Sequence, residues 1–196
     1  VDFVLGEITH GWAGPSSDRT SLLVNQGEEA GWRFRRIVNA GVERPRVHPV
    51  NWNQGDMHVA WLGHDLDGLL DLVISSSDYP DDQRLRLYRQ KPDHTFEEVT
   101  KDVGLDWVAS NSVSVADLDR DGDPDLLVGR SMMRLTKEQR AAIPNEVAVW
   151  RNDQRTGRHW LAVTLEGKKG RSNRSAIGAR VVVQTGDRRQ TRPVTG

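Results

Sequence analysis

Five aspartates stand at alternate positions in ADLDRDGDPDLLVG, the stretch that covers residues 116–129. They are Asp117, Asp119, Asp121, Asp123 and Asp125. Two carboxylates about 4 Å apart repel each other by roughly 4 kcal/mol at an effective dielectric constant near 20. A compact turn of this composition therefore needs a cation, and alternating oxygen ligands along a turn suit Ca²⁺.

The order of residues in this turn predicts a role for each position. We expect the first three carboxylates to face the ion, and the carbonyl of Asp123 and both oxygens of Asp125 to complete the shell. Gly122 allows the sharp bend because it has no Cβ. A calcium-binding helix–loop–helix is excluded, since Val128 stands where its twelfth-position glutamate belongs and the following residues are typical of a strand. A solvated acidic turn without an ion is the alternative.

A second copy of the turn lies upstream, in DLDGLLDLVISS at residues 65–76. Its predicted calcium ligands are Asp65, Asp67, Asp71 and the carbonyl of Leu69. Gly63 replaces the first aspartate, which removes one ligand charge and predicts weaker binding. The neighbouring His64 is expected at the surface.

Repeated strands must position these turns. Apolar strands ending in polar turns recur at residues 21–26, 85–90 and 147–152, and related strands at 34–41 and 96–104. Residues 56–63 and 112–119, just before or running into the two turns, alternate with period two as strands do. The opening VDFVLGE matches the end of the same unit, with Asp2 in place of Asp71. The pattern predicts an all-β fold, a partial β-propeller of about three units. Three blades are too few to close a ring, so we expect other chains or further parts of the same protein to complete it.

Two segments depart from this pattern. LTKEQRAAIPNE, at 135–146, carries Thr136 and Gln139 at capping-box spacing and ends near Pro144, which predicts a short inserted helix. Residues 167–196 hold eight Lys or Arg against the single acid Asp187. We interpret this basic bias as the solvated face of a hairpin rather than a nucleic-acid site, because the rest of the chain is acidic.

Composition excludes several function classes. The chain has no cysteine, so disulfides and thiolate metal sites are excluded, and its apolar runs are too short to span a membrane. No catalytic motif is present, which favours a protein that is not an enzyme. Among the seven tryptophans, Trp61 and Trp150 are expected in the core, and Trp12, Trp52 and Trp107 are candidate exposed platforms for sugars.

The pattern Asp-x-Asp-x-Asp-Gly-x-x-Asp before an apolar strand resembles the FG-GAP or VCBS repeat, and LRLYRQKPDHTFEEVTKDVGL resembles the strands that follow in that repeat. The resemblance covers residues 1–152. Residues 153–196 include RHWLAVTLEGKKGRSNRSAIGARVVV, which is similar to the start of an ASPIC/UnbV domain of the cartilage-acidic-protein type, a small β module.

This resemblance implies a calcium-binding repeat module outside the cytoplasm: periplasmic, at the cell surface or secreted. It further implies adhesion, recognition or scaffolding, with a protein or glycan as the partner. The alternative is a set of accessory repeats in a polysaccharide-processing enzyme.

Overall fold

The computed structural model describes residues 2–16, 19–44, 53–77, 83–154, 157 and 159–195. The chain forms two compact units, Val1–Gly157 and Arg158–Gly196. Strands dominate both units, and the helical segments of the described residues are short, as expected for an all-β fold.

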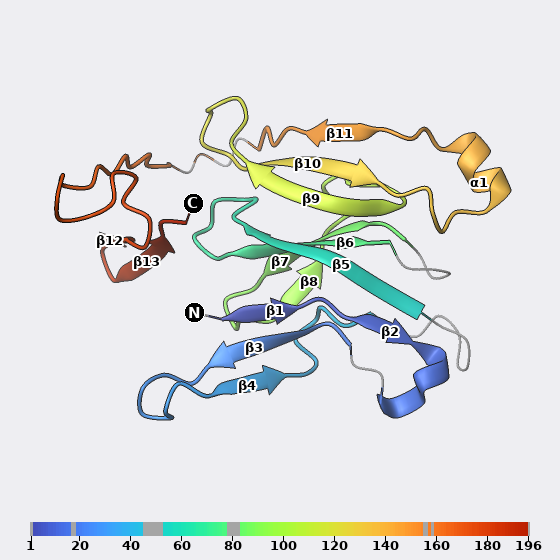
Figure 1. The fold of residues 1–196 in the computed structure, drawn as a ribbon, viewed down its shortest axis with the longest axis horizontal. Coiled ribbons are helices and arrows are strands. Elements are labelled where there is room, and N and C mark those ends of the chain that lie inside the picture. The colour runs from blue at the N-terminus through green and yellow to red at the C-terminus, as the bar shows by residue number, and fades with distance from the viewer. Residues whose placement is uncertain are drawn as a thin grey trace. The chain divides into compact units, whose positions relative to one another are not determined.

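The described residues of the first unit form three antiparallel sheets (Figure 1), named here sheets I, II and III. Sheet I has the order β1 (Phe3–Leu5), β3 (Ser21–Asn25), β4 (Phe34–Ile37). Sheet II has the order β2 (Ile8–His10), β5 (Asn53–Leu62), β6 (Asp71–Ser76), β7 (Leu85–Gln90), β8 (Phe96–Glu98). Sheet III has the order β11 (Val147–Trp150), β10 (Asp125–Arg130), β9 (Ser110–Ala116).

The strand pairing follows the order expected for the predicted repeats. β1–β3, β6–β7 and β10–β11 are equivalent antiparallel pairs. β5 pairs with β6 as β9 pairs with β10. The upstream acidic turn therefore connects β5 to β6, and the downstream acidic turn connects β9 to β10. The sheets are consistent with propeller-like blades, but the described residues do not form a closed ring.

The core of the first unit lies on the two faces of sheet II. Leu72 and Ile74 of β6 pack in a cluster with Leu22 of sheet I. Val73, between them, belongs to a second cluster with Leu126 and other residues of sheet III. Successive strand side chains point to opposite faces, so a strand that is apolar at consecutive positions supplies both clusters.

The predicted inserted helix is present as α1 (Lys137–Ala142), between β10 and β11. Thr136 accepts a hydrogen bond from the N–H of Gln139, and the Gln139 side chain accepts one from the N–H of Thr136. This reciprocal capping box satisfies two donors that the first turn would leave free. Arg130, at the end of β10, donates to the carbonyl of Pro144 and so holds the returning chain.

The second unit contains a hairpin of β12 (Arg180–Thr185) and β13 (Arg188–Pro193). Before it, the Asn173 side chain accepts from the N–H of Ile177 at 2.7 Å and donates to its carbonyl at 2.8 Å. The basic side chains of β12 and β13 are exposed, as expected for a solvated hairpin.

Candidate metal centre

The turn at residues 117–125 joins β9 to β10 and gathers three of its five aspartates. Carboxylate oxygens of Asp117, Asp119 and Asp121 lie within 4.8 Å of one another, and all three side chains are exposed. Arg120 and Gly122 adopt positive φ angles of 66° and 96°, which fold the backbone around the cluster. Three convergent carboxylates offer hard oxygen ligands of the kind that Ca²⁺ binds.

Hydrogen bonds to the backbone hold these side chains inside the turn. Asp117 accepts from the N–H of Gly122 at 3.1 Å, and Asp121 accepts from the N–H of Asp123 at 3.0 Å. Asp119 accepts from the N–H of Asp121 at 3.3 Å. Each carboxylate keeps lone pairs beyond these bonds, so the same oxygens can also face a cation.

The electrostatics of the turn disfavour its fully charged state. Loss of solvent raises the pKa of Asp119, and repulsion from Asp121 and Asp125 raises it further. Burial likewise raises the pKa of Asp123, with added repulsion from the other carboxylates, Asp121 first. A bound cation would reverse this penalty, because an opposite charge favours the ionised carboxylates.

Asp125 has a structural role that sequence reasoning missed. It is 1% exposed, and its oxygens accept from the N–H groups of Leu118 at 2.8 Å and Asn152 at 2.9 Å. The carboxylate thus pins the start of the turn and the end of β11 to the start of β10. The ligand roles of Asp125 and of the Asp123 carbonyl stay predictions.

The Asp125 bond recurs in every repeat. Asp2 accepts from the N–H of Asn25, and Asp71 accepts from the N–H of Gln90, each at 2.9 Å as in Asp125–Asn152. In each unit the aspartate stands at or just before the start of one strand, and the polar residue stands at or just after the end of the paired strand. In each unit this bond joins the start of one strand to the end of its neighbour.

The upstream turn, between β5 and β6, shares this backbone. Leu66 and Gly68 have positive φ angles, as Arg120 and Gly122 do at the equivalent positions. Asp65 accepts from the N–H of Asp67 at 3.0 Å, and Asp67 accepts from that of Leu69 at 2.8 Å. Among the described residues, ligand atoms of His64, Asp65 and Asp71 lie within 4.8 Å of one another. The ligand roles of Asp65, Asp67, Asp71 and the Leu69 carbonyl all stay predictions.

The expectation of a surface position for His64 is wrong. His64 is 7% exposed, and its Nδ1 lies 2.7 Å from Oδ2 of the fully buried Asp71. Asn152 of the next repeat donates to the His64 carbonyl at 2.8 Å. Alternation along the strand could not indicate this position, because it lies in the turn after β5.

The expectations for the tryptophans are partly confirmed. Trp61 and Trp150 pack against the core clusters, and Trp12 is 83% exposed. Trp107 is buried, contrary to expectation, with the Arg130 guanidinium 3.5 Å from its ring centroid. Trp52 lies outside the described residues.

The first unit is thus an all-β array of repeats, in which acidic turns connect β5 to β6 and β9 to β10. Comparison with protein families agrees: the model of the FG-GAP-like repeat matches residues 64–128, from the upstream turn into β10. FG-GAP repeats are commonly extracellular modules of adhesion and recognition. The ASPIC/UnbV resemblance of the second unit gains no support and stays a prediction.

Comparison with the curated proteins and with the solved structures finds no match. Within the described ranges, no helix is long and apolar enough to cross a membrane.

Proposed function

We propose that the chain is a calcium-stabilised recognition module that works outside the cytoplasm and has no catalytic role of its own. The observation that carries the proposal is the convergence of Asp117, Asp119 and Asp121 in one turn. This turn lies within the segment that matches the FG-GAP-like repeat, whose members commonly serve adhesion and recognition. The ion would stabilise the turn, and the sheets would present the binding surface to a protein or glycan.

Calorimetric titration with Ca²⁺ tests the metal site. We expect one binding event for the unmodified chain and affinity on the order of tenfold or more weaker for Asp119→Asn, which removes a ligand charge but keeps the side-chain size. Asp102→Asn is the matched control, because Asp102 is exposed and lies outside both turns. Absence of heat with the unmodified chain would contradict the proposal, as would equal effects of the two substitutions.

A glycan array and an extracellular-protein array, each run with Ca²⁺ and with chelator, test recognition. We expect binding on one of them that falls when calcium is removed, because an unbound turn is less ordered. Binding of the same strength with chelator would show that recognition does not depend on calcium, and it would contradict this part of the proposal.

A further inference from the structure

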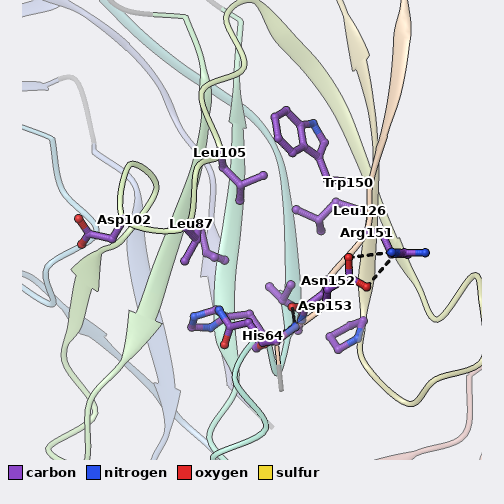
Figure 2. Close-up of a pocket in the computed structure, with 13 residues that line it drawn as sticks. His64, Leu87, Asp102, Leu105, Leu126, Trp150, Arg151, Asn152 and Asp153 are labelled. Carbon is purple, nitrogen blue, oxygen red and sulfur yellow. Dashed lines mark hydrogen bonds and ion pairs between the residues drawn. The ribbon is translucent and has the colours of Figure 1, made fainter. Parts of the chain in front are cut away.

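The first unit contains a pocket of about 340 Å³ whose walls come from sheets II and III. Figure 2 shows the side chains that line it, with His64 toward one end and Trp150 toward the other. Leu62, Leu87, Leu105 and Leu126 supply apolar walls. The volume lies at the lower end of the range for small-molecule sites, which are mostly apolar with a few placed polar groups.

His64 supplies such a polar group. The side chain is more than nine-tenths buried and contributes to the pocket wall. Its Nδ1 lies 2.7 Å from Oδ2 of Asp71, which also accepts from the N–H groups of His64 and Gln90. Asp71 thus engages Nδ1 and leaves the opposite ring nitrogen, Nε2, outside this interaction.

The other ring nitrogen is left for a ligand. In the part of the chain that the structure describes, no hydrogen bond engages Nε2 of His64. Each ring nitrogen of an imidazole can form one hydrogen bond, as donor or acceptor according to the tautomer. A hydroxyl group matches Nε2 because it can both donate and accept.

The turn itself does not require a histidine here. Leu118 holds the equivalent position in the next repeat, and its side chain is 52% exposed. Its N–H makes the same bond to Asp125 that the N–H of His64 makes to Asp71, at 2.8 and 2.9 Å. The hydrogen bonds that shape the turn therefore do not need the imidazole. Asn152 donates to the carbonyl of His64 and so holds the backbone of that residue in place.

The rest of the pocket selects a neutral, flat body. Trp150 offers an aromatic surface among the leucines, and aromatic rings pack well against such a wall. At the rim, Arg151 pairs with Asp153 at 2.9 Å, so their charges offset each other. We infer that the pocket binds a small neutral ring compound bearing a hydroxyl group, which hydrogen-bonds with Nε2 of His64 while the ring lies among the leucines and Trp150.

Titrations with p-cresol and toluene, followed by NMR of the whole chain, test this inference. The two compounds share a methylated ring and differ by the hydroxyl group. We expect both to shift resonances of pocket residues, p-cresol to bind about tenfold more tightly because of the added hydrogen bond, and only p-cresol to shift His64 Nε2. No binding, equal affinities, or an unmoved Nε2 resonance would each overturn the inference.

Two substitutions test whether the imidazole itself, rather than the fold around it, gives the preference for p-cresol. His64→Leu copies the residue of the next repeat, and we expect it to keep toluene binding and lose the preference for p-cresol. Leu118→His, which places the same side chain in the exposed equivalent position, should leave both affinities unchanged. A preference retained in His64→Leu would overturn the inference. If that variant fails to fold, the Nε2 measurement on the unmodified chain still decides.

Discussion

The turns at residues 63–71 and 117–125 share one backbone but balance their charges differently. Both place a buried aspartate, Asp71 or Asp125, on equivalent N–H groups. In the first turn His64 packs on that aspartate, and Gly63 replaces the leading carboxylate. In the second turn three exposed carboxylates converge. The comparison shows that the same backbone hydrogen bonds build both turns, while the side chains set the local charge of each.

Removal of the buried aspartate should have the largest effect. Asp71→Ala leaves the N–H groups of His64 and Gln90 and the imidazole without their acceptor. We expect a loss of about 3–5 kcal/mol in the free energy of unfolding, measured by urea denaturation. Asp2→Ala removes the equivalent but exposed carboxylate, and its cost should stay below about 1 kcal/mol. Equal costs would contradict this role of the buried aspartate.

Calcium removal should have the next largest effect. At free calcium about 100 times the Kd, binding contributes roughly 2.7 kcal/mol, so chelator should lower the Tm by about 5–10 °C. Asp119→Asn should show about half of this shift or less, because a site tenfold weaker contributes only about 1.4 kcal/mol at the same calcium concentration. A chelator effect of equal size in both proteins would place the ion elsewhere.

Exchange of the leading residues should interconvert the two turns. A Cβ on Gly63 would lie 3.7 Å from the Leu69 carbonyl oxygen, an ordinary contact, so Gly63→Asp fits without strain. We expect it to strengthen calcium binding at the upstream turn, and Asp117→Gly to weaken binding at the downstream turn, each on the order of tenfold. Calorimetry of the two variants measures this, and unchanged affinities would show that the leading residue is not a ligand.

Acid should reduce the difference in thermal stability between the metal-free and calcium-bound forms. The pKa of Asp119 and that of Asp123 are raised, so the folded metal-free turn binds more protons than the unfolded chain. These groups therefore make the metal-free protein less stable as pH rises through the carboxyl range, and the penalty disappears below it. Because Asp119→Asn removes one of these carboxylates, it should melt at a higher temperature than the unmodified chain in chelator at neutral pH. Melting curves measured in chelator from neutral pH to about pH 4 should show this difference in Tm shrinking.

Much of the fold could be predicted from local pattern. Period-two apolar alternation placed the strands, and the spacing of Thr136 and Gln139 placed α1, because both depend on residues close in sequence. The Asp117, Asp119 and Asp121 cluster was also predictable, since one short turn contains it. The burial of Trp107 was not, because its neighbours in sequence are typical of a loop and its ring partners, Trp150 and Arg130, come from sheet III.

The sequence by itself determined the repeat, the acidic turns and the strands that flank them, because each is encoded within a few neighbouring residues. Only the tertiary structure decided that Asp125 binds Asn152, that His64 faces Asp71 inside the fold, and that a pocket opens beside it. These contacts join residues brought together by turns and by packing between sheets, and burial rather than local pattern gives a polar side chain its partner.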